Sequence, residues 1–461
     1  MKRTIKLVVL GLFIAACSNG TSTSSSASPT TSLLATTTIT NPPLVDGGLI
    51  SIDPATLIPL QGSEPILVAD WFSGVVSPNG AFAAIESLAG DNQVLQVSLI
   101  ELATNEVLAN VDMPHGTWDR PIVDNDGMVY WLGGEQGLSL YRVQLGDTEA
   151  EILYSGFPPS LSGVSLDLLP DGRFGVFGSR FDERPEGEAT VILVAADASG
   201  HEEILLESVT AGFANEPDPD STIQVFEFAG NAPVWDHDGD RFLLVEAARD
   251  VVTQVNLSTS EVSEHSFSLP EATLSHLFAW LTPVAQAKGP VAGVTRDAIL
   301  APDGRDLFVA TLISGTEVEE TSWETNRLPQ DVMVLDTDTW TVSVLDVSAD
   351  TLDASPNGIH LLAHGAEVTE GTSAGFEVQP SPIHVIDIST SEVLLNFQTS
   401  DVSAAEIQFS ADGELVYIST WSQDTATIDI LDLGLLQLTG AVSFRELSLV
   451  GQAGFMAFHL E

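Results

Sequence analysis

A short turn motif recurs along the chain and constrains its fold more than any other feature. Each copy has glycine preceded by Asp or Asn, and a hydrophobic segment follows at once. Proline presets φ in several copies, and glycine accepts the positive φ that such tight turns require. The spacing of 45 to 67 residues between successive glycines indicates one repeated unit with insertions of variable length. The seven copies occupy residues 77–85, 124–132, 169–177, 236–245, 301–310, 355–363 and 410–419.

A second pattern follows the turns: an alternating hydrophobic strand, a polar break with Thr or Ser, and a further strand. Residues 332–347, 383–397 and 427–440 show it most clearly. Each unit therefore holds about four strands with turn signals between them, which is the composition of a propeller blade. No long segment has helical periodicity, so the sequence predicts an all-β fold.

These units resemble the repeats of WD40-like, TolB-type and YVTN-type β-propellers. The best single match is 410–433, with Tyr417, Ile418, Ser419 and Thr420 at the position of the YVTN motif. The resemblance covers residues 46–461 and implies that this whole region is one β-propeller. It departs from eukaryotic WD40 repeats, because no unit has a clear Trp-Asp pair closing its third strand.

The two ends of this region suggest how the ring closes. Residues 49–60 resemble the third and fourth strands of a blade, and residues 444–461 resemble a first and second strand. Joined, they would form one composite blade and leave no open edge. We therefore expect eight blades, seven complete and one composite. Seven blades are the alternative, if the ends extend their neighbours instead.

The N-terminus is typical of a bacterial lipoprotein. Residues 1–16 have a positive start and an apolar run of eight that is too short to span a bilayer. Residues 14–17 (Ile-Ala-Ala-Cys) resemble the lipobox, in which the cysteine is lipidated and becomes the new N-terminus. Cys17 is the sole cysteine of the chain. We expect a signal peptide over 1–16, followed by the lipidated Cys17 and a disordered Ser/Thr-rich tether over 17–45. The lipid would anchor the chain to a membrane of the cell envelope, at the cell surface or in the periplasm.

The charge of the chain is strongly one-sided. It has 65 Asp and Glu against 15 Lys and Arg, with a formal net charge of −50. Such a field repels phosphate backbones, so we predict no binding to nucleic acid. It favours solubility and attracts cations and basic partners, although an acidic surface can also be a general adaptation to salt.

The resemblance implies that the turns between strands one and two, and between three and four, share one face of the ring. The opposite face then receives the long loops at 180–190, 208–233, 268–297, 313–330 and 364–382, several of which are acidic like the rest of the expected surface. Long segments on a rigid scaffold often carry function, so we predict a protein or small-molecule binding face there, over blades three to six. Its candidate residues are Trp118, Arg120, Arg180, Arg184, Trp280, Trp323, Arg327 and Trp421.

Motifs of catalysis and metal binding are scarce. Residues 236–240 (Asp-His-Asp-Gly-Asp) resemble a calcium loop, but Ala247 stands where the final Glu is expected, and the segment coincides with a blade turn. The chain contains no Gly-x-Ser-x-Gly elbow and no His-Glu-x-x-His motif, and we predict no cofactor.

The anchor, the ring, the long loops and the missing motifs favour a tethered binding or scaffold module for an envelope protein or ligand. The alternatives are a propeller hydrolase, lactonase-like or glycan-active and possibly metal-dependent, and a factor for envelope assembly.

Overall fold

The computed structural model describes residues 71–445 and four short strands between residues 48 and 67. Within 71–445 the description omits 90–93, 102–103, 105, 114–120, 135–136, 159–160, 181–186, 214–227, 237–239, 248, 268–290, 319–322, 372–374, 398–405, 411 and 423–424. The described part is all-β. It contains no helix that could cross a membrane.

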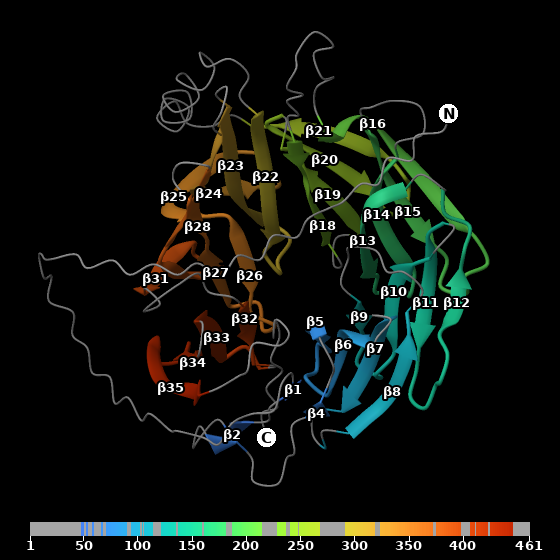
Figure 1. The fold of residues 1–461 in the computed structure, drawn as a ribbon. Helices are drawn as coiled ribbons and strands as arrows, with labels where there is room; N and C mark the ends of the chain where they lie inside the picture. Colours follow the sequence, from blue (N-terminus) through green and yellow to red (C-terminus); the bar gives the residue numbers. More distant parts are fainter. Residues whose placement is uncertain are drawn as a thin grey trace, which may run out of the picture.

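The strands form a β-propeller. In the part of the chain that the structure describes, seven antiparallel units of four strands follow one another, each spanning one copy of the turn motif. Figure 1 shows them arranged around a ring, with the first strand of each unit nearest the centre and the fourth at the periphery. We number these blades one to seven in chain order.

The strands of each blade have the following bounds. Blade one contains β5 (Trp71–Val76), β6 (Phe82–Ala89), β7 (Val94–Glu101) and β8 (Glu106–Asp112). Blade two contains β9 (Ile122–Val123), β10 (Val129–Gly133), β11 (Ser139–Val143) and β12 (Glu151–Tyr154). Blade three contains β13 (Leu161–Leu168), β14 (Phe174–Arg180), β15 (Gly187–Val194) and β16 (His201–Phe213). Blade four contains β18 (Ala232–Asp236), β19 (Arg241–Val245), β20 (Val251–Asn256) and β21 (Val262–Ser266). Blade five contains β22 (Val291–Leu300), β23 (Asp306–Val318), β24 (Trp323–Asp336) and β25 (Val342–Ala349). Blade six contains β26 (Thr351–Ala354), β27 (His360–His364), β30 (Ile383–Asp387) and β31 (Glu392–Phe397). Blade seven contains β32 (Glu406–Phe409), β33 (Leu415–Ser422), β34 (Thr425–Asp432) and β35 (Gln437–Arg445).

The repeated motif joins strands one and two of every blade, as predicted. In blade six, the amide of Gly358 donates to the carbonyl of Ser355 at 2.8 Å. The amide of Ile359 donates to Asn357 Oδ1 at 3.1 Å, which is the reason that Asp or Asn precedes the glycine. The described motif glycines have positive φ, namely Gly80, Gly127, Gly172, Gly304, Gly358 and Gly413.

The motif turns also connect neighbouring blades. The amide of Asn79 donates to Asn125 Oδ1 at 2.9 Å, and its side-chain Nδ2 donates to the Asn125 carbonyl at 3.1 Å. In the same way, Asn357 Nδ2 donates to the carbonyl of Asp412 at 2.9 Å. The side chain before each of these glycines therefore stabilises both its own turn and the contact with the next blade.

The turns between strands three and four also share one form, which recurs along the chain. Asp336 Oδ1 accepts the amide of Thr339 at 2.8 Å, and Asp387 Oδ1 accepts the amide of Thr390 at 2.9 Å. The carboxylate thus satisfies a backbone donor that would otherwise be unpaired at the end of the hairpin. This is the polar break that the sequence places between the last two strands.

The core lies between the faces of neighbouring blades. Each described cluster of buried apolar side chains joins two successive blades, from blades one and two through to blades six and seven. Trp131, Phe242 and Phe308 are among its largest fully buried side chains. Burial on both faces explains why the middle strands are almost continuously hydrophobic, as in β10, where every residue is buried.

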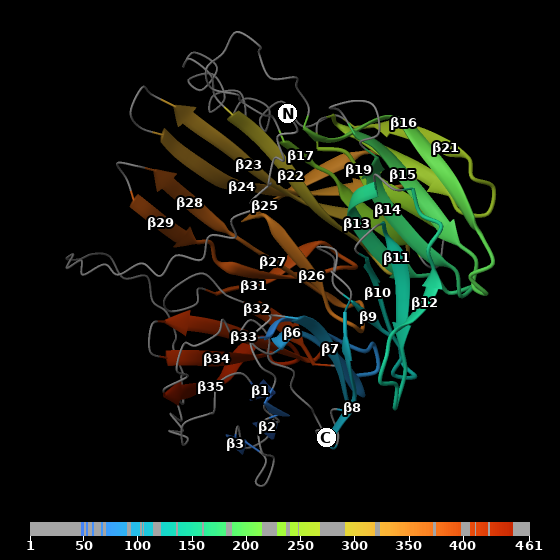
Figure 2. The same ribbon diagram turned by 45° about the vertical axis from the view of Figure 1, so that its right-hand side comes forward.

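The long segments pair with one another beyond the blades. The outer parts of β16, β22, β23 and β24 continue past the ring and are joined by β17 (Phe228–Gly230), β28 (Ala366–Gly371) and β29 (Gly375–Pro380). Together they form the part of one continuous sheet that we call the extension sheet, in the order β16, β17, β22, β23, β24, β28, β29. In Figure 2 its hairpins β23–β24 and β28–β29 project side by side from blades five and six.

The closure of the ring is described only in part. The short strands β1 (Gly48–Leu49), β2 (Ile52–Asp53), β3 (Ile58–Pro59) and β4 (Ile66–Leu67) pair as β1 with β4 and β2 with β3. Figures 1 and 2 show them beside blades one and seven. Phe444 and Arg445 end β35 and so belong to blade seven, while residues 446–461 lie outside the described part. The composite eighth blade stays a prediction.

Candidate functional site

The extension sheet occupies the face on which the long insertions were expected. It uses parts of the segments 208–233, 268–297, 313–330 and 364–382, all of which the sequence predicts to be loops. For 313–330 and 364–382 that interpretation is wrong in detail. Both form hairpins, β23–β24 and β28–β29, which pair through Asn326 opposite Thr369. Mutual pairing satisfies backbone groups that isolated acidic loops would leave to water.

Both sides of the extension sheet carry exposed residues, Arg327 on one side and Glu367 on the other. Residues in register point to the same side, so Ser314, Arg327 and Val368 share one side. Arg327 is exposed there, while Ser314 and Val368 are partly buried. The residues of the opposite side include the buried Ile313. Arg327 therefore places one of the few cations of the chain on the surface of the extension sheet.

The other predicted residues are distributed over several blades. Trp323 begins β24, the strand that carries Arg327, and its register partner is Val318. Arg180 ends β14 in blade three, and Trp421 lies in β33 of blade seven. The structure thus brings two of the predicted residues onto one strand. The remaining ones lie outside the described residues, and they are Trp118, Arg120, Arg184 and Trp280.

A buried guanidinium lies at the base of the extension sheet. Arg296 of β22 has a side chain only 5% exposed, and its Nη2 donates to Asp250 Oδ1 at 2.9 Å. The guanidinium carbon lies 5.3 Å from the ring centre of Phe267. Its Nε and Nη1, like Oγ1 of the facing Thr311, have no hydrogen-bond partner among the described residues. Burial lowers the pKa of Arg296, and the bond to Asp250 opposes that effect.

An ion pair in blade four holds the turn that carries Asp250, the partner of Arg296. Both carboxylate oxygens of Glu246, which is 1% exposed, accept from Arg249 at 2.7 Å, and one also accepts from Thr253 Oγ1 at 2.8 Å. The bonds to Glu246 raise the pKa of the Arg249 guanidinium. This arrangement fixes the turn between β19 and β20, which carries Asp250.

A second polar cluster joins the first strands of blades five and six. Asp297 of β22 accepts the amide of Leu352 in β26 at 2.8 Å, and burial raises the pKa of its carboxyl group. Nearby, His364 Nε2 and Asp353 Oδ2 are 2.8 Å apart. The charge of Asp353 adds to the rise in the pKa of Asp297. The pair lies on β26 and β27, the first two strands of blade six.

Sequence reasoning missed these clusters because their members are isolated in the chain. Arg296 and Asp297 are adjacent, but their partners Asp250, Leu352 and Asp353 lie about fifty residues away and belong to other blades. The sequence offers no spacing signal for such contacts. Among the described residues, no three His, Cys, Asp or Glu side chains are grouped as a metal site.

The segment considered for calcium is the turn of blade four. Asp236 is 5% exposed, and its Oδ2 accepts from Arg241 Nε at 2.5 Å. Arg241 also donates to the carbonyl of Gly304 in blade five. Asp236 therefore has a cationic partner that connects two blades, in agreement with the interpretation as an ordinary turn. Residues 237–239 lie outside the described part.

No family model and no curated protein match the chain. Among solved structures, it is similar to the dihydro-heme d1 dehydrogenase NirN in complex with DHE, with 14% identity over 90% of this chain and 76% of that chain, at a TM-score of 0.48. It is similar to the β-propeller domain of Cps50 (Swd1) from Myceliophteria thermophila, with 14% identity over 77% and 94% and a TM-score of 0.39. It is also similar to TolB from Acinetobacter baumannii, with 13% identity over 78% and 81% and a TM-score of 0.32. At these TM-scores, the likenesses carry no argument about what the chain binds.

Proposed function

We propose that this chain is a lipid-anchored binding or scaffold module of the bacterial cell envelope. Cys17 would attach it to the membrane, and residues 18–45 would act as the tether. The propeller would recognise a protein or small-molecule ligand through the extension sheet. The net charge of −50 favours a partner with a basic surface.

The extension sheet is the observation that carries this proposal. Ordinary blades need short connections, yet the segments between blades three, four and five and between the middle strands of blades five and six are long, and parts of them pair into a single sheet. Ordering these segments costs conformational entropy, about 1–2 kcal/mol for each residue fixed. A sheet built at that cost on one face of a rigid ring is a suitable platform for recognition.

The first experiment removes the hairpin β28–β29. The amide of Ser381 donates to the carbonyl of Gly365 at 2.9 Å, so the two ends of the hairpin are adjacent. Residues 366–380 can therefore be replaced by Asn-Gly, which forms a two-residue turn. We expect the shortened chain to fold and to lose capture of its partner from envelope extracts after cross-linking. Unchanged capture would contradict the proposed face.

Point variants provide a matched pair. Arg327→Gln removes a cation from the extension sheet, whereas Arg305→Gln removes one from the motif turn at the other end of β23. The Arg305 side chain is 59% exposed, and it pairs with Asp336 at 3.1 Å. We expect Arg327→Gln to weaken capture and Arg305→Gln to leave it unchanged. Equal effects would point to net charge rather than to a binding face.

The anchor has an independent test. A Cys17→Ser variant should lose incorporation of radiolabelled fatty acid and leave the membrane fraction, because a thioether anchor needs the cysteine sulfur. Retention of the label in this variant would show that Cys17 is not the lipidated residue. This result is separable from the binding assays, which use the same propeller in either form.

A propeller hydrolase is the second candidate, favoured by the cluster of Asp297, Asp353 and His364. A histidine held by a carboxylate can act as a general base, and the neighbouring buried carboxyl has a raised pKa. Hydrolysis of lactone or glycoside panels that disappears in His364→Ala would support it. Absence of turnover by the wild-type chain on these panels would rule against it.

A further inference from the structure

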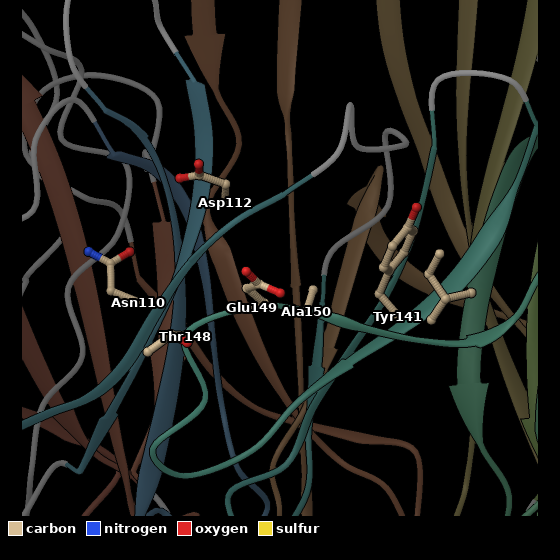
Figure 3. A pocket seen from close by; sticks show the side chains of 7 residues that line it. Asn110, Asp112, Tyr141, Thr148, Glu149 and Ala150 are labelled. Carbon is tan, nitrogen blue, oxygen red and sulfur yellow. The ribbon is translucent and has the colours of Figure 1, made fainter.

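A groove lies between blades one and two, apart from the extension sheet. Its volume is about 500 Å³, within the usual range of ligand sites. Figure 3 shows the labelled side chains that line it, from β8 of blade one and from β11 and the segment before β12 of blade two. The lining consists of Asn110, Asp112, Tyr141, Thr148, Glu149, Ala150 and Ile152.

The groove is acidic, and no described cation neutralises it. Asp112 and Glu149 are both exposed, and neither forms a salt bridge with a described residue. Asp112 Oδ1 accepts from the neutral amide of Gln96 at 2.6 Å. The neighbouring Arg142 is paired instead with Glu151. Two carboxylates therefore face one hollow and remain able to accept bonds from an ammonium or guanidinium group.

The rim of the groove is apolar on the side of blade two. Ile152, which lines the groove, is 55% exposed, and Leu145 in the preceding turn is 65% exposed. That turn is fixed against blade one, because the amide of Gly146 donates to the carbonyl of Leu108 at 3.2 Å. Exposed aliphatic side chains beside two carboxylates without a described cationic partner suit a ligand that is both basic and apolar.

The aromatic residue of the groove argues against a saccharide. Sugars stack on an open aromatic face, but Tyr141 is only 6% exposed. It also stacks against Trp131, with ring centres 5.4 Å apart and planes at 10°. Its ring is therefore part of the wall, and the accessible chemistry is that of the carboxylates, the Asn110 amide and Ile152.

We propose that this groove is a second recognition site, which binds an extended segment of a partner protein through a Lys or Arg side chain flanked by an aliphatic residue. The basic group lies between Asp112 and Glu149, and the aliphatic side chain covers Ile152. The site is independent of the extension sheet, because its residues belong to blades one and two. Its loss would leave binding at blades five and six intact.

Fluorescence anisotropy with labelled hexapeptides and the full-length chain tests this site. The alternating Leu-Lys peptide should bind, the Leu-Glu peptide should not, and Gly-Lys should bind at least threefold more weakly than Leu-Lys. The double variant Asp112→Asn with Glu149→Gln should weaken the Leu-Lys peptide about tenfold, since charge-assisted bonds are lost. Ile152→Ser should weaken Leu-Lys but not Gly-Lys.

The matched control changes the net charge equally at a distance. Glu261 and Glu392 are exposed residues of blades four and six, and the double change to Gln should leave affinity within twofold of wild type. Equal weakening in both double variants would overturn the proposal, because the attraction would then be a general charge effect. Failure of the wild type to bind Leu-Lys, or displacement of that peptide by chitotetraose, would overturn it as well. Thermal unfolding of each variant confirms that the fold is retained.

Discussion

Replacing Gly358 by alanine should separate the two reasons for glycine in the motif. Gly358 has φ of +69°, and a Cβ built on it would lie 2.4 Å from Cγ of Pro302 in the turn of blade five. The backbone conformation alone costs a residue with a side chain about 1–2 kcal/mol. Overpacking against a rigid proline ring adds about 1–3 kcal/mol. Alanine also restricts the unfolded chain, which offsets about 0.5 kcal/mol of this cost, so we expect a net loss of about 1.5–4.5 kcal/mol.

Gly146 offers a control with the same conformation and no neighbour. Its φ is +83°, and a Cβ there would meet nothing within 4 Å among the described residues. Gly146→Ala should therefore cost about 1 kcal/mol, from the backbone alone. The difference between the two variants measures the contact between blades five and six.

Urea unfolding followed by tryptophan fluorescence gives the free energy of unfolding of each variant. Pro302→Ala, which removes the Cγ atom, should recover about 1 kcal/mol or more when combined with Gly358→Ala. Equal losses for Gly146→Ala and Gly358→Ala would refute the packing argument. Strict additivity of Pro302→Ala and Gly358→Ala would refute it too, because residues in contact should couple.

Three further predictions concern the titratable groups. Burial raises the pKa of Asp297 above the usual 3.8, so the folded chain keeps this proton at pH values where the unfolded chain has lost it, and its stability falls as pH rises through the folded pKa. Asp297→Asn should therefore gain stability relative to wild type as pH rises from 3.5 to 7, measured by urea midpoints. Asp250→Asn should destabilise by about 3 kcal/mol, because it leaves the buried Arg296 without its carboxylate, and adding Arg296→Met should restore most of the loss in the same assay. Burial raises the pKa of Tyr130 to about 12, so a rapid pH jump followed at 295 nm should show one phenol ionising near pH 12 that is absent in Tyr130→Phe.

The features that the sequence predicted correctly depend on local chemistry. A motif such as Ser355 to Gly358 closes its own hydrogen bonds within five residues, so its residue types identify it wherever it occurs. The apolar run of a strand such as β19 reports burial on both faces in the same local way. Together these signals define the blades and their order.

The parts that could not be predicted depend on contacts between distant segments. Residues 313–330 are rich in Glu and Thr, a composition that predicts a solvated loop. Their strand character arises from pairing with β22 and β28, whose paired residues lie up to 47 positions away, as for Glu324 and Gly371. Likewise, the burial of Arg296 depends on blade four, and nothing beside it in the sequence reports that neighbour.

The pairing of the long segments changes how their contributions can be tested. β28 pairs with β24 over Glu324 to Arg327, and β24 in turn pairs with β23. Removing β28 and β29 therefore also exposes the edge of β24, whose backbone donors and acceptors then face water. A loss of binding after excision can come from the missing hairpin or from the altered β24. Arg327→Gln keeps every backbone pair, so agreement between the excision and this variant assigns recognition to the side of the extension sheet that carries Arg327.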